Sequence, residues 1–465
     1  MRRNLALIAL TCMLLRAADW PTVGGSPQRD GWAKSETAFT KDNVKGLELL
    51  YKFKAGSAPS TPMVLGRLIT YLGFKEMLVF ADSSDSAYSL DADLNRAIWK
   101  AHFSTEPVKT PAVIPEGCRD LMPVPIAMAG SSTAVVARTS RPAPGAVATP
   151  VRRPARGGEF FAVSSDGYLH IVNPSTGEDR APAMQFVPPN SKVSALNISD
   201  NVVYAATLDG CGGKADSMYA LDLASDANKV VAQPAQGGSI VGSEGSAIGQ
   251  DGFVYAQARN LNGGNDAVFA LQPKTLAVND YFLTKTKITE LGPGATPVIF
   301  NWAGSEVIAA GGSDGRLFLL DPKAMKVPLF ESEPIAAGGF HNAFASWEDP
   351  EKLRWLYASS AAGVIGFRVE DRSGKPVLTK VWASAALASA SAPVIANGVV
   401  FVLASNGLNA LDASTGKMLY NSGRAITSPA RGGLAIANRR IYFSTQDNNV
   451  YCFGFLAEQP QLTGK

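Results

Sequence analysis

Histidine is the side chain that most readily transfers protons or binds metal ions near neutral pH, and this chain of 465 residues contains only three. His102 and His170 stand among apolar and aromatic neighbours, which favours a structural role for both. His341 differs, because it follows two glycines and a phenylalanine at the start of one of the repeating strand units described below. We therefore take His341, Asn342 and Trp347 as candidate cofactor-binding residues, with His341 acting as acid, base or ligand. The simpler interpretation is that His341 occupies a turn and satisfies backbone groups.

The acidic residues give no comparable pattern. Asp209, Asp251, Asp266 and Asp314 lie in or beside turns rich in glycine. None of them begins the Asp-x-Asp-x-Asp-Gly spacing of a calcium loop. Turn formation accounts for all four, because aspartate accepts hydrogen bonds from nearby backbone N–H groups. We assign no catalytic residue and no metal ligand from the sequence.

The four cysteines leave two alternatives open. Cys12 lies in an apolar segment near the N-terminus, so Cys118, Cys211 and Cys452 are the ones to consider in the rest of the chain. In an oxidising compartment, a disulfide between Cys118 and Cys211 is plausible, since both lie in loops of adjoining strand units. Cys452 stands in an apolar strand and is expected to be a buried hydrophobic residue. The alternative is three free thiols.

The elements that must position these residues are short strands, which recur in one repeating unit. The clearest copy has an apolar stretch at 392–402, a second stretch ending at Leu411-Asp412, and a Thr-Gly-Lys turn at 415–417. This pattern predicts a unit of four antiparallel strands. Such a unit cannot bury both faces alone, so its repetition predicts stacked neighbours in a closed ring.

A Leu-Asp pair, or a related pair, marks each unit and gives the number of units. The pairs begin at residues 90, 172, 221, 271, 320, 367, 411 and 453. From residue 172 onward they are 42 to 50 residues apart, as expected for four-stranded propeller blades of about 40–50 residues. Aspartate suits this position because its carboxylate accepts hydrogen bonds from N–H groups two residues on. The sequence predicts an all-β, eight-bladed propeller.

The last unit supplies only three strands, while an unassigned strand lies near the start of the chain at 47–53. If that N-terminal strand is added to the last blade, two exposed sheet edges disappear at once. We therefore expect the N-terminal strand to close the ring of four-stranded antiparallel blades.

The gap of 82 residues between the first two pairs contains an insertion at about 104–158, rich in proline and alanine. Five arginines and no acidic residue lie between positions 138 and 156. This segment could dock an anionic partner or surface. The simpler interpretation is a solvated loop without a partner, and its prolines disfavour strand formation.

The composition of the chain and its first 17 residues indicate where the protein is located and which partners it could bind. The formal net charge is only +3 and 18% of residues are charged, so we expect no nucleic-acid partner. Residues 1–17 have the basic start and apolar core of a secretory signal peptide, with lipid attachment at Cys12 as an alternative. The apolar core is too short to span a bilayer. We expect a monomer in the periplasm or outside the cell, with residues 18–465 forming a single propeller.

The repeated cassette, with its Gly-Val-Val-Phe stretch, Leu-Asp-Ala step and Thr-Gly-Lys turn, resembles the repeat of the pyrroloquinoline-quinone-like (PQQ-like) β-propeller family. Residues 19–32, which begin Asp-Trp-Pro, also look like the segment before the first blade of that family. The resemblance covers essentially the whole chain after residue 17. It implies one of two kinds of protein: quinoprotein dehydrogenases that hold PQQ and Ca²⁺ on the axis, or non-catalytic propellers that include a lipoprotein of outer-membrane barrel assembly.

The motifs favour the second kind. The adjacent cysteines that cover the quinone in many alcohol-oxidising members are absent from this sequence, as is the Cys-x-x-Cys-His motif of members with a fused haem. We therefore expect a non-catalytic binding or scaffold module for a protein partner in the cell envelope. The alternative is a PQQ-dependent oxidoreductase acting on alcohols or sugars. A third class, a sugar-binding propeller, predicts that Trp302, Trp347 and Trp355 are exposed on one face.

Overall fold

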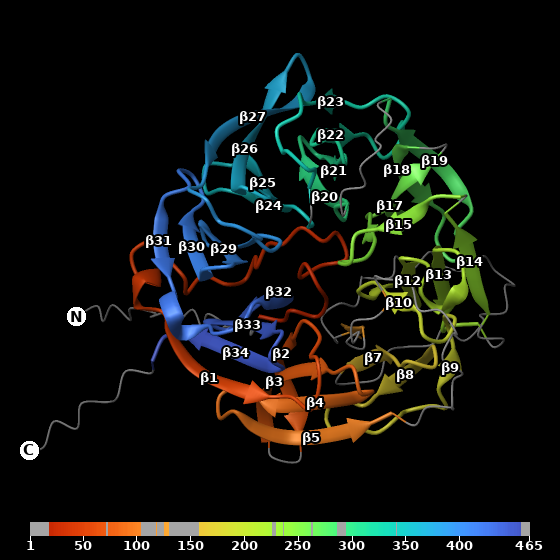
Figure 1. Cartoon of the computed structure of the whole chain (residues 1–465), viewed down its shortest axis with the longest axis vertical. Coiled ribbons are helices and arrows are strands. Elements are labelled where there is room, and N and C mark those ends of the chain that lie inside the picture. The colour runs from red at the N-terminus through yellow and green to blue at the C-terminus, as the bar shows by residue number, and fades with distance from the viewer. Residues whose placement is uncertain are drawn as a thin grey trace, which may run out of the picture.

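Eight antiparallel sheets surround a central axis in the computed structural model, each with its innermost strand towards that axis (Figure 1). The structure describes residues 18–70, 73–103, 118, 125–129, 158–225, 229–235, 237–261, 264–285, 294–340 and 342–456. Every sheet follows the order inner to outer strand along the chain, apart from the last, in which the outer strand comes from the N-terminus. The prediction of an eight-bladed propeller with four-stranded blades is confirmed. In two blades the inner strand is divided into two short pieces.

The first four blades follow one another directly in the chain. Blade 1 comprises β2 (Met63–Thr70), β3 (Gly73–Ala81), β4 (Ser86–Asp91) and β5 (Arg96–His102). Blade 2 comprises β6 (Ile126–Ala129), β7 (Glu159–Val163), β8 (Tyr168–Val172) and β9 (Met184–Gln185). Blade 3 comprises β10 (Lys192–Val193), β11 (Asn197–Ser199), β12 (Val202–Leu208), β13 (Ser217–Asp222) and β14 (Val230–Pro234). Blade 4 comprises β15 (Ser239–Val241), β16 (Ala247–Ile248), β17 (Val254–Leu261), β18 (Asn265–Leu271) and β19 (Val278–Leu283).

The remaining blades complete the ring. Blade 5 comprises β20 (Val298–Trp302), β21 (Ser305–Gly311), β22 (Leu317–Leu320) and β23 (Phe330–Glu331). Blade 6 comprises β24 (Ala345–Glu348), β25 (Arg354–Ser360), β26 (Gly363–Arg372) and β27 (Lys375–Ala383). Blade 7 comprises β28 (Val394–Ala396), β29 (Val399–Ala404), β30 (Gly407–Asp412) and β31 (Met418–Asn421). Blade 8 comprises β32 (Ala430–Ala437), β33 (Arg440–Thr445), β34 (Asn449–Gly454) and β1 (Glu48–Lys54).

The pairing of β1 with β34 closes the ring, as predicted. The two strands run antiparallel from the pair Glu48 and Gly454 to the pair Lys54 and Asn449. A large apolar cluster spans this junction and includes residues of blades 7, 8 and 1. Within it, the ring centroids of Phe39 and Phe401 lie 5.3 Å apart. Because burial of each large apolar side chain contributes about 1.5–3 kcal/mol, this cluster holds the two ends of the described chain together.

Six of the eight pairs lie where the third strand of a blade turns into the fourth, whereas Phe367-Arg368 lies within β26 and Phe453-Gly454 ends β34. Their carboxylate or amide oxygen accepts a hydrogen bond from the backbone N–H two residues on, at 2.8–3.0 Å, in five blades: Asp91, Asn173, Asp222, Asp321 and Asp412. In these five blades the repeat therefore reflects the need to fix one tight turn.

The meander topology gives the propeller two distinct faces. Turns between the first and second strands and between the third and fourth strands lie on one face. Turns between the second and third strands, and the connections between blades, lie on the other. We call this second surface the funnel face and the first the opposite face.

Residues 18–36 precede the first strand and run along the inside of the ring, where Figure 1 shows them as the red trace through the centre. We call them the axial arm. Its backbone hydrogen-bonds to the inner strands of six blades: Trp20 to Val64, Pro21 to Met128, Pro27 to Ile248, Gln28 to Ile299, Asp30 to Ser346, and Gly31 to Ile395. Side chains add contacts to the other two blades, through Thr22 to Leu196 and through Glu36 to Arg439. The arm thus contacts every blade.

The segment predicted as an insertion at 104–158 contains one element of the propeller. Its residues Ile126–Ala129 form β6, the inner strand of blade 2, and pair with β7. The extra residues therefore divide into one part before β6 and one part after it. The arginine-rich stretch at 138–156 lies outside the described residues.

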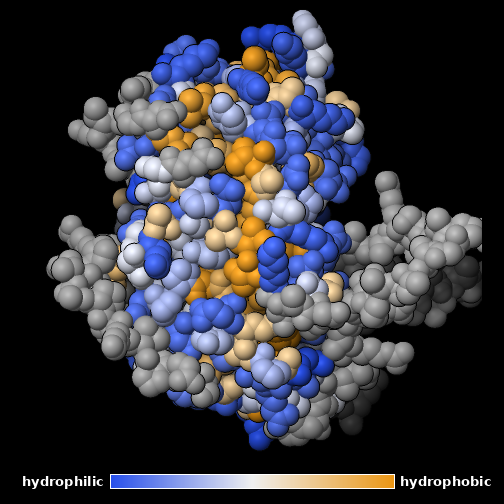
Figure 2. Space-filling model, turned by 90° about the vertical axis from the view of Figure 1, so that its right-hand side faces the viewer, coloured by the Kyte–Doolittle hydropathy of each residue, from blue (hydrophilic) through white to orange (hydrophobic). Residues whose placement is uncertain are grey.

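The outer strands form the side of the ring. Figure 2 views the side on which β14 and β19 lie and shows an apolar band between hydrophilic areas. On β19, Val278 and Tyr281 are 36% and 45% exposed. In the part of the chain that the structure describes, no helix is long and apolar enough to cross a membrane.

Cys452 lies in β34 and is fully buried, as predicted. Burial raises the pKa of its thiol to about 12. Because the thiolate is the reactive form, we expect no reaction with a thiol reagent at pH 8 in the native protein beginning at Ala18. Denaturation should release one reactive thiol per chain, and a Cys452→Ala variant should release none. Rapid modification of the native protein at Cys452 would contradict this prediction.

Candidate functional site

A large cavity lies on the axis, in the middle of the ring. It has a volume of about 490 Å³, and residues of seven blades and the axial arm line it. Most of these residues lie on connections that enter inner strands, so the cavity opens on the funnel face. We call it the axial funnel. Its wall is rich in small and hydroxyl-bearing residues: Ser60, Thr61, Ser243, Ser389, Ser391, Gly432 and Gly433.

Three charged side chains also line the axial funnel: Lys192, Glu244 and Arg431. Lys192 Nζ lies 2.7 Å from Asp209 Oδ2, so its charge is compensated at the rim. Glu244 is only 8% exposed, and burial raises its pKa to about 7 against the opposing effect of the Arg29 charge. Glu244 therefore changes charge near neutral pH at the base of the funnel.

Arg29 of the axial arm lies beneath Glu244 and is fully buried. Its guanidinium donates hydrogen bonds to Thr22 Oγ1 at 2.6 Å, to the Leu196 carbonyl at 2.9 Å and to the carbonyl of Val23. Its Nε donates to the Ser246 carbonyl at 3.2 Å. Desolvation by burial lowers its pKa to about 10, while the Glu244 carboxylate acts in the opposite direction. These contacts join the arm to blades 3 and 4.

Two of the three predicted cofactor-binding residues are described by the structure, and they lie in different surroundings. His341 lies outside the described residues. Asn342 lines the axial funnel, and its Nδ2 donates to the Ala390 carbonyl at 2.9 Å. Trp347 is 6% exposed and packs in the apolar cluster between blades 6 and 7, next to residues such as Trp382. Asn342 and Trp347 therefore do not share one site.

The other residues singled out from the sequence have structural surroundings. Trp355 is 5% exposed and donates from Nε1 to Asp349 at 2.9 Å. Like Trp347, it does not offer the exposed aromatic surface that the sugar-binding interpretation expected, whereas Trp302 is half-buried. His170 is buried, with Nε2 3.1 Å from Ser164 Oγ and its ring stacked on Phe103. This setting agrees with a structural histidine.

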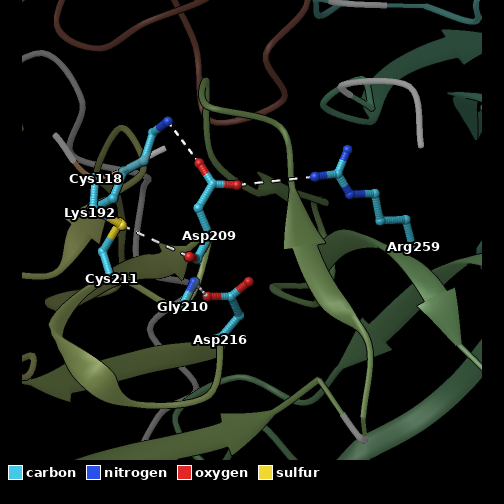
Figure 3. Close-up of a disulfide and its surroundings, with 7 residues drawn as sticks. All are labelled: Cys118, Lys192, Asp209, Gly210, Cys211, Asp216 and Arg259. Carbon is cyan, nitrogen blue, oxygen red and sulfur yellow. Dashed lines mark hydrogen bonds and ion pairs between the residues drawn. A yellow bond between two sulfur atoms is a disulfide. The ribbon is translucent and has the colours of Figure 1, made fainter. Parts of the chain in front are cut away.

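A disulfide joins Cys118 to Cys211, with their Cα atoms 5.7 Å apart. Figure 3 shows it beside Asp209, whose carboxylate lies 2.7 Å from Lys192 Nζ and 4.0 Å from the Arg259 guanidinium. Since Lys192 lines the axial funnel, the disulfide attaches a residue of the segment before β6 to the funnel rim at blade 3.

The sequence does not show that residues 18–36 line the axis, and it does not locate most of the funnel wall. Arg29 and Glu244 come from distant parts of the chain, and neither belongs to a motif. The serines of the funnel wall look like turn residues in the sequence, so no local signal distinguishes them.

The described lining of the axial funnel does not fit a PQQ–Ca²⁺ centre. Calcium takes six to eight oxygen ligands and usually several carboxylates, whereas Glu244 is the one acidic residue of this lining and has Arg29 next to it. Across the residues that the structure describes, no group of three His, Cys, Asp or Glu side chains is placed to hold a metal ion. The described funnel wall also offers no aromatic ring on which a quinone could stack.

The chain has the fold of the PQQ-like eight-bladed propellers, which confirms the predicted resemblance at the level of fold. Solved structures that it resembles include a europium-containing methanol dehydrogenase, with a TM-score of 0.64, 12% identity, and coverage of 94% of this chain and 98% of that one. Another is quinohemoprotein alcohol dehydrogenase from Comamonas testosteroni, with a TM-score of 0.59, 13% identity, and coverage of 96% and 82%.

BamB from Moraxella catarrhalis is a third similar structure, with a TM-score of 0.55, 15% identity, and coverage of 89% of this chain and 99% of that one. No protein-family model matches the chain. No curated protein sequence matches it either. At these identities the likeness establishes the fold, and the fold alone does not separate a dehydrogenase from a binding propeller.

Proposed function

We propose that this protein is an exported, non-catalytic propeller whose funnel face binds a partner protein in the cell envelope. The observation that carries this proposal is the wall of the axial funnel, in which hydroxyl groups and exposed backbone from several blades surround one carboxylate and two cations. Hydroxyl and backbone groups bind by hydrogen bonds, and they supply neither a metal centre nor an electron acceptor.

The size and position of the funnel also support binding. Its volume of about 490 Å³ falls within the ~300–1,000 Å³ typical of binding pockets, which is room for the tip of a partner's loop. Ser243 and Ser389 are exposed at its edge. A rigid ring that presents loop residues on one face is a common arrangement for binding.

The alternative is a PQQ-dependent oxidoreductase, and the fold and the axial position of the funnel are what support it. Calorimetric titration of the protein from Ala18 onward with PQQ in the presence of Ca²⁺ separates the two. We expect no saturable heat and no quinone-dependent reduction of a redox dye with alcohols or sugars, in a sample shown to unfold cooperatively. Micromolar binding together with dye reduction would overturn the non-catalytic proposal.

Partner binding can be tested directly by photo-crosslinking in the cells that produce the protein. A photoreactive residue at Ser243, on the funnel edge, should give a discrete crosslinked protein from the envelope fraction. The matched control is Val327, which is 74% exposed in a turn between the third and fourth strands of blade 5, on the opposite face. Equal crosslinking from both positions, or none from Ser243, would contradict binding through the funnel face.

A further inference from the structure

A second, smaller cavity lies on the opposite face, where the axial arm passes blades 4, 5 and 6. Its volume is about 160 Å³. The arm contributes Gln28, Asp30, Trp32 and Lys34, and the blades contribute residues of their inner hairpins, among them Asn301, Glu306 and Arg354. We call it the arm pocket. It is separate from the axial funnel, with which it shares no lining residue.

The backbone of the arm fixes this arrangement. The carbonyls of Gln28 and Asp30 accept hydrogen bonds from the N–H groups of Ile299 and Ser346, at 3.0 and 2.8 Å. Arg29 and Gly31 have left-handed backbone conformations, with φ of 59° and 61°, and the chain between them and around them places positions 28, 30, 32 and 34 in the lining of the pocket. The wall is therefore held by main-chain bonds to two blades and does not depend on a mobile side chain.

Most charges of the arm pocket are already paired. Asp30 Oδ2 lies 2.7 Å from Lys34 Nζ, and Arg354 Nη2 lies 3.0 Å from Glu348 Oε2. Lys34 and Arg354 also lie 5.2 and 5.8 Å from the ring centroid of Trp32. Among the charged groups of the lining, these pairs leave Glu306 without an ion pair in the described structure. An anionic ligand would be repelled by Glu306 or would have to disrupt these pairs, whereas a neutral ligand that donates a hydrogen bond to Glu306 would not.

The remaining hydrogen-bonding capacity suits hydroxyl groups. In the described part of the structure, the Glu306 carboxylate accepts from a single donor, the Gln250 N–H, at 3.1 Å to each oxygen. Arg354 Nε is buried without an acceptor among the described residues. The side-chain amides of Gln28 and Asn301 provide further donors and acceptors. A hydroxyl both donates and accepts, and so it can satisfy the carboxylate, the guanidinium and the amides alike.

We propose that the arm pocket binds a neutral sugar ring, either as a free monosaccharide or as the terminal unit of a glycan. Its volume of about 160 Å³ is room for several water molecules, and a group the size of one sugar ring would replace them. Hydroxyls of the sugar would donate to Glu306 and accept from Arg354 and the amides. The edge of Trp32 would contact the less polar face of the ring.

The test uses the whole chain from Ala18 and a panel of glucose, galactose, mannose, N-acetylglucosamine and their β-linked disaccharides. We expect at least one sugar to give a saturable calorimetric signal, with a Kd of about 1 mM or tighter. A free-monosaccharide site would bind the monosaccharide at least as well as the disaccharide. A glycan-end site would prefer the disaccharide. The absence of saturable binding across the panel, or binding of a zwitterionic amino acid instead, would overturn the proposal.

Two substitutions in the arm pocket test whether sugar binding, where it is observed, takes place there. Glu306→Gln keeps an acceptor for the Gln250 N–H but removes the charge, and it should weaken sugar binding by about tenfold or more. Asn301→Ala, at an exposed position, should weaken it with little effect on folding. The matched control is Glu333→Gln, whose side chain is 90% exposed and far from the pocket in sequence. Unchanged affinity in both pocket variants, with wild-type thermal unfolding, would also overturn the assignment.

Discussion

Replacing Arg29 by methionine is expected to lower the free energy of unfolding by about 3–5 kcal/mol, because a buried guanidinium with four hydrogen bonds is lost and buried acceptors are left without donors. The substitution removes the donors that serve the Thr22 hydroxyl and the carbonyls of Val23 and Leu196. It also leaves Glu244 buried without its neighbouring positive charge. The measurement is urea-induced unfolding of wild type and variant at several pH values.

The pH dependence gives this prediction a distinct signature. The pKa of Glu244 is about 7 in the folded protein, compared with an ordinary value of 4.5. The unfolded chain therefore binds fewer protons at this site, and wild-type stability should fall as pH rises from about 4.5 to 7. Without Arg29 the folded pKa rises further, so the decline continues above pH 7. The difference between wild type and Arg29→Met should consequently be larger at pH 8 than at pH 5.

A double variant provides the control. Glu244→Gln removes the carboxylate that Arg29→Met leaves unpaired, so the two substitutions together should cost less than the sum of their separate effects. If the two effects simply add, and if the loss in Arg29→Met is independent of pH, then Arg29 is held by its hydrogen bonds alone and its electrostatic interaction with Glu244 contributes nothing.

The parts of the fold that were predictable from sequence have local causes. The turn at each Leu-Asp pair depends on one side chain and the backbone two residues on, as at Asp412 and Ser414. The spacing of the eight Leu-Asp or related pairs predicted the number of blades, although the side-chain hydrogen bond that fixes this turn occurs in five of them. The three-stranded last unit and the spare strand at 47–53 then required ring closure by β1, since each would otherwise leave an exposed edge.

The site was less predictable because its residues meet only after the ring closes. Glu244 and Arg29 are separated by 215 positions in the sequence (244 minus 29), and neither belongs to a recognisable motif. Trp347 follows His341 and Asn342 into the inner strand β24, where neighbouring residues have different surroundings. The backbone N–H of Ser346 donates to the axial arm, whereas the Trp347 side chain packs between blades.

Loss of the Cys118–Cys211 disulfide is expected to lower the free energy of unfolding by about 3–5 kcal/mol, because it closes a loop of roughly 100 residues. The two cysteines are 93 positions apart. Cys118→Ser, Cys211→Ser and the double variant should lose the same amount, since each removes the same bond. Unfolding in urea, followed with and without dithiothreitol, measures the effect.

The reductant supplies an internal control for this prediction. Dithiothreitol should shift the wild-type midpoint to that of the double variant and leave the double variant unchanged. Cys452 is buried and outside the disulfide, so Cys452→Ala should retain the full response to reductant. A wild-type midpoint that does not respond to dithiothreitol, despite complete reduction shown by thiol counting, would refute the predicted contribution. A loss confined to the affinity for a funnel-face partner would instead mean that the bond acts at the rim near Lys192 and contributes little to the stability of the ring.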